Sequence, residues 1–153
     1  MSETLKTILC CTDFSPESEH AVEHAARLAR STNSTLILAH LVHVASGELL
    51  SHDPHGPTNL TLSEARARAL KQLEELRARR AGDYANVELV AKFGSPAESA
   101  MALAKERGAD IIVTAVSDRH THREPTDLLH HSVTEALTRH APCPVLVVPP
   151  HAR

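Results

Sequence analysis

The chain has 153 residues, of which 42% are hydrophobic and 23% are charged, and its formal net charge is -3. This composition is typical of a globular protein, and the length indicates one domain over residues 1–153. The weak negative charge argues against nucleic acid and anionic membrane surfaces as partners. Because neither a signal peptide nor an apolar run of about 18 residues is present, we expect a cytoplasmic protein without a membrane span.

Short apolar runs alternate with helical patterns, which predicts a parallel sheet covered by helices on both faces. The first strand is expected over residues 7–11. Ser15, followed by a proline, is then placed to cap the first helix. The buried stripe of that helix is expected to be Ala21, Val22, Ala25, Leu28 and Ala29. Residues 35–39 form the second predicted strand.

The segment 45–58 lacks apolar periodicity and contains glycine and prolines, which predicts a long surface loop. A helix is expected over Leu62–Arg80, and Gly82 is placed to end it. The buried stripe of this helix is expected to be Ala65, Ala69, Leu73 and Leu76. Residues 87–90 alternate as an edge strand does.

A capping box at Ser95 predicts the start of a third helix, which Gly108 ends. The fourth and fifth strands are expected over Ile111–Ala115 and Val145–Val148. A loop and a helix over residues 126–139 connect them. The pattern therefore predicts a doubly wound, five-stranded parallel sheet of order 3-2-1-4-5. Its ligand crevice should lie at the switch point between strands 1 and 4.

Four segments, residues 7–15, 110–113, 132–135 and 140–149, resemble the universal stress protein family. The resemblance covers essentially the whole chain and implies the adenine nucleotide alpha hydrolase-like fold. It also implies a homodimer formed through the fifth strand, at Val145, Leu146, Val147 and Val148. An uncapped apolar edge strand agrees with such pairing.

The resemblance implies an ATP site whose positions in this chain are Thr12, Asp13, Leu41, Ala115, Asp118, His131, Ser132 and Val133. Asp13 matches the acid that holds the adenosine part, and Leu41, which follows His40, matches the residue that touches the base. The alternative for Asp13 is a turn or cap residue.

The phosphate loop of this family depends on glycines, which let backbone N–H groups surround the phosphates. Here Ala115, Asp118 and His131 occupy the three glycine positions, and Ser132 alone survives. The loop is also three residues longer than the family pattern, and a carboxylate at position 118 would repel polyphosphate. Cationic donors for an anion remain available: His120, His122, Arg123, His130 and His131.

Twelve histidines are present, several of them in this loop and the following helix start. Imidazoles near Asp118 could bind zinc or nickel. The pairs at 120/122 and 130/131 lack the i, i+4 spacing of a helical metal site, so we expect surface histidines and no metal ligand. The loop over 117–126 is expected to be mobile. The three cysteines, Cys10, Cys11 and Cys143, are expected to be packing residues in a reducing compartment, with a redox role as the alternative.

Other classes of protein in which strands and helices alternate agree less well with this sequence. A receiver domain needs a phosphoacceptor acid at strand 3 and a lysine after strand 5, and a flavin carrier needs stacking aromatic residues; the chain contains no Trp. No nucleophile and base stand at credible spacing, so no enzyme is expected. The sequence predicts a non-catalytic stress-response regulatory or binding protein with no strongly bound cofactor. The alternative is an ATP- or AMP-binding sensor, or a weak nucleotide hydrolase, that uses a remodelled loop.

Overall fold

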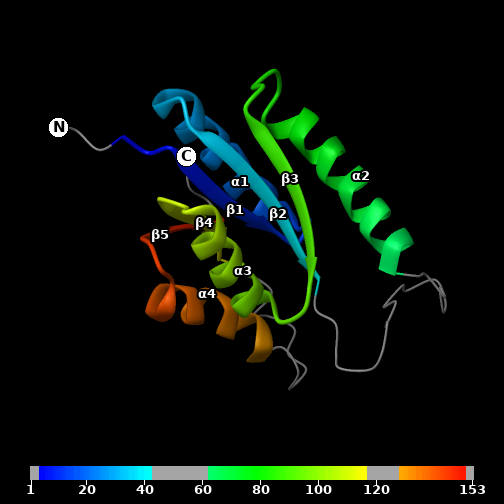
Figure 1. The fold of residues 1–153 in the computed structure, drawn as a ribbon, viewed down its shortest axis with the longest axis vertical. Coiled ribbons are helices and arrows are strands. Elements are labelled where there is room, and N and C mark those ends of the chain that lie inside the picture. The colour runs from blue at the N-terminus through cyan, green and yellow to red at the C-terminus, as the bar shows by residue number, and fades with distance from the viewer. Residues whose placement is uncertain (1–3, 43–61, 117–127, 151–153) are drawn as a thin grey trace.

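The computed structural model describes residues 4–42, 62–116 and 128–150, in which strands and helices alternate (Figure 1). The strands are β1 (Thr7–Thr12), β2 (Thr35–Val42), β3 (Val87–Phe93), β4 (Ile111–Ala115) and β5 (Val145–Val148). The helices are α1 (Pro16–Thr32), α2 (Leu62–Arg80), α3 (Pro96–Arg107) and α4 (Leu128–His140). The loops predicted over residues 45–58 and 117–126 lie outside the described ranges.

The five strands form one parallel sheet in the order β3-β2-β1-β4-β5, which confirms the predicted topology. β1 lies at the centre, where Ile8 pairs with Leu36 of β2 on one side and with Ile111 of β4 on the other. From β1 the chain moves outward through β2 to β3, and it then crosses back past β1 to form β4 and β5 on the other side. The carboxyl ends of β1 and β4 therefore mark the switch point at which ligands bind in such sheets.

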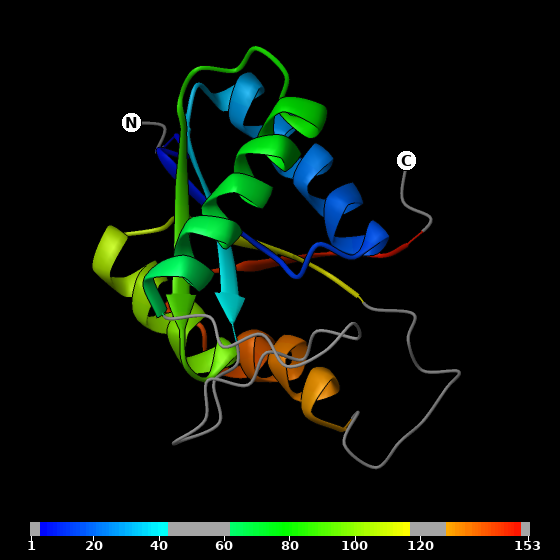
Figure 2. The same cartoon turned by 90° about the vertical axis from the view of Figure 1, so that its right-hand side faces the viewer.

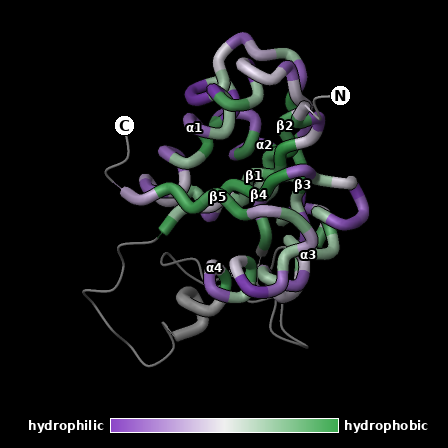
Figure 3. The backbone as a smooth tube through the Cα atoms, turned by 90° about the vertical axis from the view of Figure 1, so that its left-hand side faces the viewer, coloured by the Kyte–Doolittle hydropathy of each residue, from purple (hydrophilic) through white to green (hydrophobic). Residues whose placement is uncertain are grey.

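Helices cover both faces of the sheet, with α1 beside α2 on one face and α3 beside α4 on the other (Figure 2). Figure 3 shows that the strands are mostly hydrophobic, whereas the helices on either side of the sheet contain many hydrophilic residues. At the surface, Glu19 of α1 is paired with Arg79 at 2.6 Å and with Arg80 at 3.1 Å. Partial burial of the Glu19 carboxylate opposes ionisation, but the hydrogen bonds from both arginines hold its pKa below the ordinary value.

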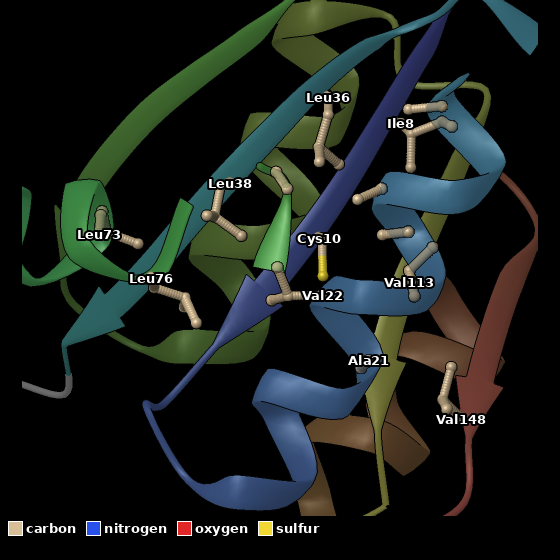
Figure 4. Packing of buried hydrophobic residues seen from close by; sticks show 14 residues of the cluster. Ile8, Cys10, Ala21, Val22, Leu36, Leu38, Leu73, Leu76, Val113 and Val148 are labelled. Carbon is tan, nitrogen blue, oxygen red and sulfur yellow. The ribbon is translucent and has the colours of Figure 1, made fainter. Parts of the chain in front are cut away.

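Alternate strand residues enter two hydrophobic clusters, one on each face of the sheet. The cluster beneath α1 and α2 includes Ile8, Cys10, Leu36, Leu38, Val113, Leu73 and Leu76 (Figure 4). The cluster beneath α3 and α4 includes Leu9, Ile37, Ile112, Leu103 and Leu137. The predicted stripe of α2 is buried at Ala69, Leu73 and Leu76 and half-buried at Ala65. The core therefore has two layers separated by the sheet.

The start of α1 is formed as predicted. Ser15 is the N-cap, and its Oγ accepts the Ser18 N–H at 3.2 Å, while Pro16 occupies the first helical position. The predicted stripe is fully buried at Ala21, Val22, Ala25 and Ala29, and Leu28 is partly buried against the same cluster. Because most of these side chains are small, α1 packs closely on the sheet.

Glycines follow two helices, also as predicted. Gly82 has a φ of 59° and donates its N–H to the Arg77 carbonyl at 3.2 Å, and Gly108 caps α3 with a φ of 61°. The predicted capping box at Ser95 is wrong in one respect. Ser95 is the N-cap of α3, but its side chain makes no capping hydrogen bond. Its backbone carbonyl accepts the Ser99 N–H at 2.8 Å, which is the first hydrogen bond of the helix.

Three strands continue past their predicted ends, β1 by one residue, to Thr12, and β2 and β3 by three. β2 reaches Val42 rather than residue 39, and β3 reaches Phe93 rather than residue 90. In this extension the ladder pairs Leu41 with Lys92. Backbone pairing between β2 and β3 continues past His40 and through Lys92, so the side-chain pattern alone underestimates the strand length. The added residues bring β2 to the edge of the crevice.

Asp110 ties the amino ends of β1 and β4 together. Its Oδ2 accepts the N–H groups of Lys6 at 2.8 Å and Thr7 at 2.9 Å. These two backbone donors hold the pKa of the carboxyl below its ordinary value. The contact lies at the end of the sheet opposite the crevice, so it fixes the pairing of β1 with β4 without entering the site.

The three cysteines are free thiols. Cys10 is fully buried in the cluster beneath α1, and burial raises the pKa of its thiol. Burial also raises the pKa of Cys11, to about 12, and that of Cys143, where the charge of Asp110 acts in the same direction. A protonated thiol is a poor nucleophile, which favours the packing interpretation over the redox alternative.

Candidate functional site

The candidate site lies where β1, β2 and β4 end together. The register pairs Thr12, the last residue of β1, with His40 of β2, and Cys10 with Val113 of β4. Since parallel strands end at one edge of a sheet, residues 12–14, 40–41 and 115–116 come from three separate parts of the chain to this edge. The structure thus brings the predicted positions of β1, β2 and β4 to one place.

A hydroxyl network joins the end of β1 to the first turn of α1. Ser18 donates its hydroxyl proton to the Ser15 carbonyl at 2.9 Å, so its oxygen accepts from Thr12 Oγ1, also at 2.9 Å. Thr12 Oγ1 in turn accepts the Phe14 N–H at 3.0 Å. Thr12 is buried, and its hydroxyl is engaged within the protein. Thr12 therefore shapes the site rather than offering its hydroxyl to a ligand.

Asp13 forms the turn that leads into α1. Its Oδ1 accepts the Ser15 N–H at 2.9 Å, and the next residue, Phe14, has a φ of 62° in the left-handed region. This confirms the turn role that the sequence left open for Asp13. The residue is exposed just beyond the carboxyl end of β1. Its role as a ligand for ribose or base stays a prediction.

His40 links the ends of β1 and β2. Its Nδ1 lies 2.9 Å from the Thr12 carbonyl oxygen, which can only accept, so Nδ1 carries the proton. Its ring centroid lies 4.4 Å from that of Phe14. Burial lowers the pKa of His40, and it outweighs the opposing effects of the Thr12 hydrogen bond and the Asp13 charge. His40 is therefore neutral at physiological pH. Its ring packs beside Phe14 in the turn between β1 and α1.

We expect His40 to make the fold sensitive to mild acid. Its pKa is below the ordinary 6.5 in the folded protein, so its contribution is complete above 6.5 and is lost as pH falls toward the folded value. His40→Asn keeps an N–H donor for Thr12 but does not titrate in this range. Urea unfolding at several pH values between about 7.5 and 5.5 should show a smaller loss of stability in the variant. Equal losses would contradict this prediction.

The remaining predicted positions divide between the two faces of the sheet. Leu41 and Val133 both pack, partly buried, against the cluster beneath α3 and α4. Ala115 packs against the other cluster, beneath α1. Asp118 lies outside the described residues. His131 and Ser132 belong to α4, which ends one residue later than predicted, and only their backbone is described.

Glu17 adds a second carboxylate near Asp13. It lies in the first turn of α1, and its Oε2 is buried with no hydrogen-bond partner within the described part of the chain. The positive end of the helix dipole stabilises a negative charge at this position. Asp13 before the helix, with Glu17 and Glu19 in its first turn, thus places three acids at the start of α1, where other α/β proteins often hold anions.

Two further features lie apart from the crevice. A groove between α2 and β3 is lined by apolar residues and by Lys92 and Arg66, and the Arg66 Cζ lies 5.5 Å from the centre of the Phe93 ring. His20 and His24 stand one turn apart on α1 with ring centroids separated by 4.8 Å. The sequence prediction concentrated on the histidines of residues 117–132 and passed over this pair. The described residues hold no group of three or more His, Cys, Asp and Glu arranged for a metal ion.

A doubly wound parallel sheet with polar groups gathered at its switch point is typical of α/β nucleotide-binding proteins. The family model described as "Universal stress protein family" matches residues 4–149. A Staphylococcus haemolyticus protein named for that family is 33% identical over 146 residues, which cover 95% of this chain and 85% of that protein. The chain therefore belongs to the universal stress protein family.

Solved structures agree with this assignment. A universal stress protein in complex with cAMP is 25% identical, with a TM-score of 0.68 over 97% of this chain and 99% of that one. The universal stress protein UspA from Lactobacillus plantarum is 23% identical, with a TM-score of 0.70 over 96% and 99% of the two chains. The second likeness supports the fold alone.

Proposed function

We propose that this chain is a non-catalytic regulatory or binding member of its family that accepts adenosine or AMP at least as well as ATP. The observation that carries the proposal is the contrast between the two halves of the crevice. The β1–β2 half is built from ordered, hydrogen-bonded residues, whereas the β4 half lacks all three glycines that a phosphate loop needs.

The β1–β2 half suits a nucleoside. Asp13 is held in a defined turn with an exposed carboxylate, which can accept hydrogen bonds from ribose hydroxyls or from an amine. Leu41 adds an apolar, half-buried surface on the neighbouring strand, suited to the face of a base. The similar protein that was solved with cAMP supports a nucleotide with one phosphate as the ligand class.

The β4 half suits a triphosphate poorly. Ala115 places a methyl group against the core where the family has a glycine, and Asp118 and His131 fill the other two positions. Asp13 and Glu17 add negative charge at the start of α1. Like charges in a partly desolvated site repel, so each added phosphate should gain little affinity.

Calorimetry with ATP, AMP and adenosine, each with magnesium, tests the proposal. We expect adenosine and AMP to bind as tightly as ATP, because the contacts that remain are those to base and ribose. Asp13→Asn, which keeps the turn acceptor but removes the charge, should weaken adenosine most and ATP least, because it also relieves the repulsion of the phosphates. An ATP affinity in the micromolar range and well above that of adenosine would overturn the proposal and favour the sensor alternative.

A restoration variant separates loop chemistry from loop length. Asp118→Gly with His131→Gly returns two of the glycines, and a gain in ATP affinity over adenosine is expected if the lost backbone donors alone weaken phosphate binding. No gain would place the cause in the three additional loop residues. Leu62→Ala, on the exposed start of α2, is a matched control that should leave all three affinities unchanged.

The proposal also holds that the chain does not catalyse a reaction at this site. The hydroxyls of Thr12 and Ser18 are engaged with each other, and the neutral His40 is engaged with the Thr12 carbonyl. None of these groups forms the nucleophile, base and orienting partner that hydrolysis requires. Release of phosphate from ATP at a rate above that of buffer, abolished by Asp13→Asn, would favour the weak hydrolase alternative.

We further propose a cytoplasmic homodimer without nucleic acid or membrane partners. The open edge strand β5 carries Leu146, which is 41% exposed, and the half-buried Val145 and Val147. The net charge of -3 gives no general attraction to phosphate-rich surfaces. In the segments that the structure describes, no helix has the length and apolar character to cross a membrane.

A further inference from the structure

His20 and His24 lie on one face of α1, outside the hydroxyl network of the crevice. Their ring centroids are 4.8 Å apart, and their planes are nearly perpendicular, at 88°. Residues four positions apart on a helix project side by side. The neighbouring Ala21 and Ala25 are fully buried against the sheet, so the backbone that carries both imidazoles is held firmly.

This spacing matches what a shared metal ion requires. Two imidazoles bound to one ion at about 2.1 Å from each nitrogen, at a roughly tetrahedral angle, have ring centroids about 5 Å apart. The observed 4.8 Å lies close to that value, so the two rings already stand at the separation that a shared ion requires. Helical histidines with this spacing are a recurrent metal-binding arrangement.

The surroundings define what kind of site this is. Arg27, one turn further along α1, has its Nη2 3.4 Å from His24 Nε2, and it competes with a cation for that nitrogen. Glu23, between the two histidines, is paired with Arg80 at 3.6 Å. The described residues hold no group of three metal-ligating side chains, so they supply two protein ligands to this site.

We infer that His20 and His24 form a two-histidine surface site for a late first-row divalent metal ion. Imidazole ligands favour Cu²⁺, Ni²⁺ and Zn²⁺ over Mg²⁺ and Ca²⁺, and Cu²⁺ should bind most tightly of these ions. Among the described residues, the site lies on α1 outside the Thr12–Ser18 hydroxyl network.

Titration of Ni²⁺ into the ¹⁵N-labelled protein, followed by NMR, locates the site directly. We expect paramagnetic broadening of the amide signals of residues 20–24 at lower Ni²⁺ concentration than elsewhere. His20→Ala and His24→Ala should each require about tenfold more Ni²⁺ for the same broadening, because a single ligand loses the chelate effect. Arg27→Gln removes the competing cation, so this variant should require less Ni²⁺ for the same broadening.

His140→Ala is the matched control, since His140 is an exposed histidine at the end of α4, and this change should leave the broadening of α1 intact. The same spectra report whether each variant is folded. Broadening that begins in another segment while α1 stays sharp, or broadening of α1 that is unchanged in His24→Ala, would overturn the inference.

Discussion

Replacing Leu38 by alanine is expected to lower the free energy of unfolding by about 3 kcal/mol, within the range of about 2 to 5 kcal/mol that buried Leu→Ala changes show. Leu38 is fully buried on β2 among the residues beneath α1 and α2 (Figure 4). The change removes transfer free energy and leaves a cavity that two helices and a central sheet can close only in part. Urea unfolding at neutral pH measures the difference.

Leu62→Ala is the control for this prediction. Leu62 is the same residue type at the start of α2 but is 50% exposed, so its truncation should change the free energy of unfolding by about 0.5 kcal/mol or less. Losses of similar size in the two variants would show that the cluster beneath α1 and α2 is not the close-packed core described above.

Val147→Lys is expected to convert the proposed dimer into a monomer. Val147 is a half-buried residue of β5, the edge strand along which a partner strand would pair in the proposed dimer. A lysine there would have to be desolvated in the dimer, whereas on a monomer the same side chain extends into water. Light scattering at tens of micromolar, for the original chain and the variant, measures the change in mass.

Two observations keep this test specific. Circular dichroism should show that Val147→Lys stays folded, since Val147 is only half-buried. Leu62→Lys adds the same charge at an exposed position on α2, which packs against β3 at the opposite edge of the sheet. This change should leave the mass unchanged. A monomer before any substitution, or a dimer that survives Val147→Lys, would contradict assembly through β5.

The sheet order and the places where the helices begin and end follow from local signals in the sequence. Ser15 with Pro16 and Gly108 act through short-range geometry, so their patterns are decisive. The end of β2 was underestimated because pairing of Leu41 with Lys92 depends on a neighbouring strand distant in sequence. At Ser95 the local pattern correctly predicted the position of the N-cap. It did not predict that the serine side chain makes no capping hydrogen bond.

The site was predictable in position but not in detail. The switch point follows from the strand order, and Asp13 follows from its place after β1. The orientation of His40 toward the Thr12 carbonyl, by contrast, requires the register between β1 and β2. The Thr12–Ser18 contact requires the left-handed turn at Phe14, and no pattern of residue types specifies that turn in advance.

The central position of β1 also has a consequence for synthesis on the ribosome. Thr7 and its partner Asp110 stand 103 positions apart, so β1 emerges long before β4 exists to cover its second edge. Until then, Ile8, Leu9 and Cys10 form an apolar segment with an open hydrogen-bonding edge, the kind of nascent strand that associates with other chains or with chaperones. Completion of the sheet must therefore wait for the last third of the polypeptide, and the rate of this long-range closure sets how long the nascent chain stays vulnerable.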